Sequence, residues 1–320
     1  MSQQPADFWT SEREPGAPAP AFGATAWRTH GKHVAPSAQE QQPAVINGQI
    51  WIDQAPWRPA ALWAVAAGLL VTGLGNRPAP LDWREVLLLL LLADLLWGGI
   101  WRLAGGRTAL PALPARSGDQ AAWLPYLQAG SPAARLLGAD HTDLWTYAVR
   151  IGAPTALLAI VVAAVLGIPA LVLTGVALVI ATLGWTMRRT LQRSPILLAA
   201  LMAVGLPWLL TLFQLQAPVT GADALAPFAL VTLWTVHHWG ELRATAYIHD
   251  WLGLALMGAT EIALCLLLIV AQTPLWLAPI VLLLLPTWLV VQRRGALKRV
   301  RFLWLVAMLL SAAALGQAGW

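Results

Sequence analysis

The stretch RIGAPTALLAIVVAAVLGIPALVLTGVALVIATLGWTMRR, from Arg150 to Arg189, decides the fold of this chain. It has no charged residue inside its basic ends, and it is about twice as long as the roughly 20 apolar residues that cross a bilayer once. The break Gly167-Ile168-Pro169 divides it, and proline ends a helix because it lacks a backbone N–H. Basic residues at both ends favour the cytoplasmic side. We therefore predict two spanning helices joined by a tight turn.

A second stretch repeats this arrangement near the C-terminus. Arg243 precedes it, Arg293-Arg294 follow it and Gln272-Thr273-Pro274 interrupts it, so we predict that it also crosses twice. None of the apolar runs alternates with the period of two that a transmembrane β-barrel requires, so we predict helices. The nine runs long enough to span are approximately 57–75, 84–103, 148–167, 169–187, 195–213, 224–240, 251–271, 274–292 and 299–317.

The composition agrees with a membrane protein. Apolar residues make up 58% of the chain and charged residues 11%, whereas a soluble domain has about 25% charged residues. The net charge is +5, but the basic residues lie at the ends of apolar runs and not on one folded face, so no nucleic-acid partner is expected. We predict an all-α, multi-pass protein of the cytoplasmic (inner) membrane with about nine transmembrane helices.

The basic residues also predict the orientation. The predicted cytoplasmic segments and their flanks hold 18 of the 20 Lys and Arg residues, and the opposite side holds only Arg77 and Arg84. Basic residues prefer the cytoplasmic side, so the N-terminus is expected there and the C-terminus on the opposite side. The predicted cytoplasmic segments are the N-terminal tail, 104–147, 188–194, 241–250 and 293–298.

Two parts of the chain are distinguished by composition. Residues 1–56 form a predicted cytoplasmic tail rich in Ala, Pro and Gln, which lacks the apolar surface to fold alone. Residues 57–320 form the predicted transmembrane domain, whose long cytoplasmic loop covers 104–147. Insertion is expected to depend on internal apolar segments, because the start has no signal-peptide pattern. Membrane lipids are expected neighbours, and the tail could contact other subunits of a membrane complex.

Ionisable side chains inside the predicted spans are the candidate functional residues, because such groups cost several kcal/mol unless they are paired. The carboxyls also have a structural interpretation. Asp94 and Glu261 could each form a hydrogen bond between helices, and Glu241 and Asp250 could be solvated loop charges. No phosphate-binding glycine loop, Ser/His/Asp arrangement or metal-ligand spacing is present in the sequence. The candidates are Asp94, Glu261, His237, His238, Glu241 and Asp250.

The order of spans and loops resembles the UbiA superfamily of intramembrane polyprenyltransferases. That family carries N-D-x-x-D-x-x-x-D at the end of its second helix, where this chain reads Ala93-Asp94-Leu-Leu-Trp-Gly-Gly-Ile-Trp101. Asp94 remains, while Trp97 and Trp101 occupy the other two acidic positions. Trp234-Thr-Val-His-His-Trp-Gly-Glu-Leu242 looks like the H-F-W-x-L stretch of the haem-farnesylating branch, but the second D-x-x-x-D is missing.

The resemblance implies a scaffold without catalysis. Prenyl transfer needs Mg²⁺ to neutralise the diphosphate leaving group, and Mg²⁺ needs several oxygen ligands. We therefore predict a non-catalytic subunit or scaffold that binds the tail of a lipid or isoprenoid, a quinone, or a carotenoid or chlorin pigment. The predicted ligand-binding residues are Trp97, Trp101, His237, His238, Trp239 and Glu261.

Two alternatives remain open at this point. One is a divergent, Mg²⁺-dependent prenyltransferase with Asp94, Glu241, Asp250 and Arg107 around a shifted metal site. The other is a small transporter or channel in which Asp94 and Glu261 lie on a polar path.

Overall fold

The fold, given by a computed structural model, is described for residues 57–72, 82–105, 151–189, 191, 193–215, 225–247, 250–293 and 297–318. These ranges contain nine helices and no strand. In order they are α2 (Trp57–Val71); α3 (Trp83–Leu90), η1 (Leu91–Trp97) and α4 (Gly98–Gly105) in one helix; α7 (Ala153–Leu166); α8 (Ile168–Arg189); α9 (Ile196–Ala200), η4 (Leu201–Gly205) and α10 (Leu206–Leu215) in one helix; α11 (Leu225–Ala246); α12 (Trp251–Val270); η6 (Pro274–Trp276) leading into α13 (Leu277–Gln292); and η7 (Leu297–Arg299) followed by α14 (Arg301–Gln317).

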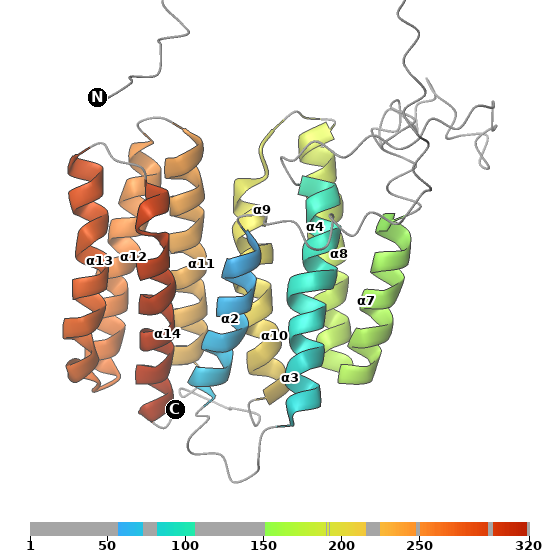
Figure 1. Cartoon of the computed structure of the whole chain (residues 1–320), viewed down its shortest axis with the longest axis horizontal. Helices are drawn as coiled ribbons and strands as arrows, with labels where there is room; N and C mark the ends of the chain where they lie inside the picture. Colours follow the sequence, from blue (N-terminus) through green and yellow to red (C-terminus); the bar gives the residue numbers. More distant parts are fainter. Residues whose placement is uncertain are drawn as a thin grey trace, which may run out of the picture. The chain divides into compact units, whose positions relative to one another are not determined.

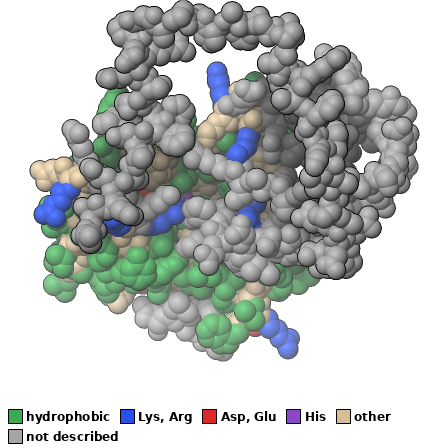
Figure 2. Space-filling view, turned by 45° about the horizontal axis from the view of Figure 1, so that its top comes forward, with side chains coloured by type: hydrophobic (Ala, Val, Ile, Leu, Met, Phe, Trp, Pro, Cys, Tyr) green, Lys and Arg blue, Asp and Glu red, His purple; other side chains and the backbone are tan. Residues whose placement is uncertain are grey.

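Five of these helices are long and apolar enough to cross a bilayer, so the chain is a multi-pass membrane protein. Three more are apolar but shorter, and α11, which carries the His pair and Glu241, is not among the five. Figure 2 shows a band of hydrophobic side chains on the surface, with the visible Lys and Arg side chains mostly on one side of it. The five long helices are Trp83–Gly105, Ile168–Arg188, Ile196–Leu215, Trp251–Val270 and Pro274–Gln292.

Both predicted breaks reverse the chain. Gly167 ends α7 at a φ of 117°, a value that glycine adopts readily, and its N–H still bonds to the Ala163 carbonyl. Gln272, at a φ of 56°, makes the corresponding turn between α12 and α13. In Figure 1 the two breaks lie at one end of the helices, and the C-terminal ends of α8 and α11 lie at the other. Each long apolar stretch therefore forms two helices, as the sequence predicts.

The predicted end of the sixth span is wrong by six residues. The sequence predicts an end at residue 240 and a loop from 241, but α11 continues to Ala246. No proline or glycine follows Gly240 in this segment, and Glu, Leu, Arg and Ala all favour helix. Glu241 and Arg243 are therefore fixed on a helix.

The buried apolar side chains form two clusters. The first lies among α11, α12, α13 and α14, and the second among the α3–α4 helix, α7 and α8. Both α2 and the α9–α10 helix contribute to each cluster and so connect them. Asp94, on η1, belongs to a helix of the second cluster, whereas Glu241 and Glu261 lie on helices of the first.

Helices α11 and α12 pack closely against each other through two glycines. A Cβ atom at Gly240 would lie 2.7 Å from the Gly253 carbonyl oxygen, and one at Gly253 would lie 2.8 Å from the Ala244 nitrogen. Small residues allow this approach between membrane helices, where dispersion contacts replace the hydrophobic effect as the driving force. The contact sets the rotation of α11 against α12, and with it the side chains that meet between them.

Candidate functional site

The polar residues of α11, α12, α13 and α14 form two neighbouring groups inside the first cluster. In the first group, Arg301 at the start of α14 donates from Nε to Glu241 Oε1 over 2.9 Å. Glu241 Oε2 lies 2.7 Å from His238 Nδ1. Because this carboxylate oxygen is an acceptor, Nδ1 of His238 carries a proton and donates it to Glu241. The Nε2 atom of His238 is buried and has no hydrogen-bond partner within the described ranges.

Glu241 is thus a buried, paired carboxylate. Its side chain is only 5% exposed, which makes its interpretation as a solvated loop charge wrong. The reason is tertiary: Arg301 lies 60 positions later in the chain, and only the packing of α14 beside α11 brings it to Glu241.

The second group centres on Glu261, in the middle of α12. Glu261 is ten residues from Trp251 and nine from Val270, so it lies about 15 Å from either end of the helix. Trp288 on α13 donates from Nε1 to Glu261 Oε2 over 2.7 Å. His237 Nε2 lies 3.4 Å from Glu261 Oε1. Both Glu261 and His237 are buried, at 8% and 4% exposure.

Aromatic side chains hold the His237 ring in place. Its centroid is 5.2 Å from that of Trp234 and 5.3 Å from that of Trp304. Each tryptophan is itself anchored: Trp234 donates to Ser311 Oγ over 2.9 Å, and Trp304 donates to Thr287 Oγ1 over 2.6 Å. Buried Trp N–H groups usually need such partners, and here they fix the ring that faces Glu261.

Outside the spanning segments, Asp250 and Arg243 close the connection between α11 and α12. Arg243 donates to Asp250 from Nε over 2.8 Å and from Nη2 over 3.2 Å. The hydrogen bond from Arg243 holds the pKa of Asp250 below its usual range. Asp250 is therefore an ionised partner of Arg243 at the N-terminus of α12, where a negative charge is also favoured.

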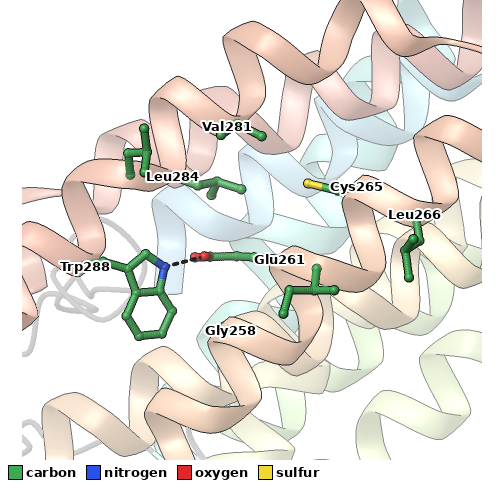
Figure 3. Close-up of a pocket in the computed structure, with 9 residues that line it drawn as sticks. Gly258, Glu261, Cys265, Leu266, Val281, Leu284 and Trp288 are labelled. Carbon is green, nitrogen blue, oxygen red and sulfur yellow. Dashed lines mark hydrogen bonds between the residues drawn. The ribbon is translucent and has the colours of Figure 1, made fainter.

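A groove runs between α12 and α13 beside Glu261. It encloses about 340 Å³, and Figure 3 shows Glu261 and Trp288 meeting across it, with Cys265 on α12 and Val281 and Leu284 on α13. Its walls are apolar except for three groups: the Glu261 carboxyl, the Trp288 indole nitrogen and the Cys265 thiol. The residues that line it are Gly258, Glu261, Ile262, Cys265, Leu266, Val281, Leu284, Leu285 and Trp288.

The other predicted site residues lie elsewhere or are packed in the core. Trp97 is fully buried and donates to Thr174 Oγ1 over 3.3 Å. Trp101 is buried, with its ring close enough to Gly184 to leave no room for a Cβ there. Asp94 is half-buried in the π-helical segment η1. Trp239 is also half-buried, and Arg107 lies outside the described residues.

Sequence reasoning missed Trp288, Arg301 and Trp304 as parts of the site. A signal existed for Trp288, which lies inside an apolar run and not at its end. Among the described residues there is no group of three or more His, Cys, Asp or Glu side chains that could hold a metal ion.

Comparisons of this chain with protein families, with curated proteins and with solved structures found no match.

Proposed function

We propose that this chain is a non-catalytic membrane subunit or scaffold that binds the tail of a lipophilic molecule in the groove between α12 and α13. The ligand class is a lipid or isoprenoid, a quinone, a carotenoid or a chlorin. The observation that carries the proposal is the groove itself, a largely apolar space of about 340 Å³ with Glu261 and Trp288 in its wall. Ligand sites typically enclose about 300–1,000 Å³, with apolar walls and a few polar groups that orient the ligand.

The exposure of the groove's edges supports entry from the bilayer. Ile262, Leu266 and Leu285 line the groove and are exposed side chains of two helices that are apolar enough to span. An apolar tail could therefore move in sideways from the lipid, with its head placed near Glu261. The indole N–H of Trp288 and the carboxyl of Glu261 are the groups that would orient that head.

Kinship with the UbiA-type scaffold and a cytoplasmic N-terminus form part of the same proposal. Nine helices in the described ranges, with the longest gap between the second and the third, support the kinship. The orientation rests on the positions of the basic residues. Asp94 lies on a helix of one apolar cluster, whereas Glu241 and Asp250 lie on or beside helices of the other, and Glu241 is already paired with Arg301. This arrangement supports a binding role over the Mg²⁺-dependent alternative.

Purification in a mild detergent followed by mass spectrometry of the extracted lipids tests the proposal. We expect a stoichiometric lipophilic molecule with the wild-type protein and a clear loss of it in Leu266→Trp, which fills the groove. The matched control is Leu282→Trp, because Leu282 is an exposed residue of α13 that does not line the groove. A wild-type protein recovered without ligand, or equal loss in both variants, would contradict the proposal.

A second candidate function, proton-linked transport, is favoured by one observation. Two carboxyls, each beside a histidine, are buried within the same four helices, and buried ionisable chains of this kind mark proton and ion pathways in membranes. Proteoliposomes that carry a pH gradient and a pH-sensitive dye test it: Glu261→Gln should abolish proton movement. Equal rates with wild-type, mutant and empty liposomes would exclude transport of protons.

A further inference from the structure

The charges of α11, α12, α13 and α14 leave Glu261 without a permanent positive partner. The four helices contain two arginines and no lysine. Arg243 is bound to Asp250, and Arg301 is bound to Glu241. Their ionisable side chains are His237, His238, Glu241, Arg243, Glu261, Cys265 and Arg301.

A proton is therefore the charge that these four helices leave available to balance Glu261. An unpaired carboxylate in a dry, apolar environment is strongly unfavourable, and such a group usually takes up a proton instead. Among the residues that the structure describes, His237 is the basic side chain in contact with Glu261, at 3.4 Å. One proton, carried by the carboxyl or by the imidazole, makes the pair neutral overall.

The contacts of Glu261 leave one of its oxygens facing the imidazole. Trp288 donates to Oε2, which makes Oε2 the acceptor oxygen of the acid. The Oε1 atom is then the hydroxyl oxygen, and it faces His237 Nε2. A proton on Oε1 or on Nε2 would lie between the same two atoms, so this contact can hold one proton on either group.

The surroundings of the pair separate it from the other charges. From α11, the nearest further ionisable groups are His238 and Glu241, which bond to each other. From α14 there is Arg301, which is held by Glu241, and α13 contributes none. On α12 itself, Cys265 lies one turn away and lines the same groove.

We propose that His237 and Glu261 form a proton-binding site in the middle of the membrane, which holds one exchangeable proton and is reached from the lipid through the α12–α13 groove. The groove gives access because Glu261 forms part of its wall. The site does not depend on the proposed ligand: it follows from the charge count and the contacts of Glu261, and it would hold a proton in a groove filled only by bulk lipid.

Labelling with dicyclohexylcarbodiimide tests this site. This lipid-soluble reagent needs a protonated carboxyl: the acid proton moves to one carbodiimide nitrogen, the carboxyl oxygen bonds to the central carbon, and an oxygen-to-nitrogen acyl shift leaves a stable N-acylurea with no other product. We expect one label per chain at neutral pH, mapped to Glu261 by mass spectrometry and lost in Glu261→Gln. Glu241, whose carboxylate is paired with Arg301, should stay unlabelled.

The role of His237 is tested by His237→Phe, which keeps a ring between the two tryptophans but removes the base. Without the imidazole the carboxyl must hold the proton alone, so we expect the pH dependence of labelling to differ from that of the wild type. An unchanged pH profile would overturn the shared site. Absence of labelling at neutral pH would overturn the proposal as a whole, because an ordinary Glu with a pKa of about 4.3 is ionised there.

Infrared difference spectroscopy gives an answer even if His237→Phe does not fold. The carbonyl band of a protonated carboxylic acid should appear in wild-type protein at neutral pH and disappear in Glu261→Gln. A spectrum without that band would refute the proton site, while lipid extracted from the same sample would still report on the proposed ligand.

Discussion

Replacing Gly253 by alanine should separate α11 from α12. The new Cβ would lie 2.8 Å from the Ala244 nitrogen and 2.9 Å from the Gly240 carbonyl oxygen. Both are backbone atoms of α11, so no rotamer change relieves the contact and the helices must move apart. Overpacking of this kind typically costs about 1–3 kcal/mol, from which the intrinsic helix preference of Ala over Gly returns about 0.5–1 kcal/mol.

The matched control is Gly175→Ala in α8, where no atom lies within 4 Å of the added Cβ. That variant should gain the helix preference alone, about 0.5–1 kcal/mol. Cys265 is the single cysteine of the chain, so its reaction with a thiol-specific fluorogenic dye during heating reports unfolding in detergent. We expect the midpoint to fall in Gly253→Ala and to rise or stay level in Gly175→Ala. Equal midpoints for the two variants would refute the close contact of α11 with α12.

Three further predictions concern the polar groups. Arg301→Gln should destabilise the protein by about 3–5 kcal/mol, because it leaves the Glu241 carboxylate buried without its arginine. The additional substitution Glu241→Gln should recover part of this loss in the same thermal assay. No recovery would argue against the pairing of the two residues. Arg243 lowers the pKa of Asp250 in the folded protein, so the ionised Asp250 stabilises the fold above its unfolded pKa of about 3.9, and this stabilisation is lost as the pH falls through the lower folded pKa. Asp250→Asn should therefore melt below the wild type at neutral pH and at the same temperature as the wild type in strong acid. A constant difference in melting temperature at all pH values would contradict this linkage. Trp304→Phe should cost about 1–3 kcal/mol, because it leaves a buried threonine hydroxyl without its indole donor, and a melting temperature equal to that of the wild type would show that the bond contributes nothing.

The sequence predicted the helices well because the signals are local. Apolar run length, proline and glycine at Gly167-Ile168-Pro169, and arginines at run ends all act within a few residues. The end of α11 was misplaced because Glu241 and Arg243 look like loop charges, and only a partner on another helix reveals otherwise. The packing of Trp101 against Gly184 could not be predicted for the same reason, since Gly184 lies far along the chain.

By itself, the sequence determined an all-helical membrane chain with two tight hairpins and a set of candidate ionisable residues. The tertiary structure alone decided their partners: Arg301 for Glu241, and His237 and Trp288 for Glu261. The physical reason is that lipid and protein core are both apolar, so most faces of a spanning helix read alike and periodicity does not show which face turns inward. The rotation of each helix is set by close packing, such as that of Gly240 against Gly253, and this packing brings the carboxyls, imidazoles and indoles together.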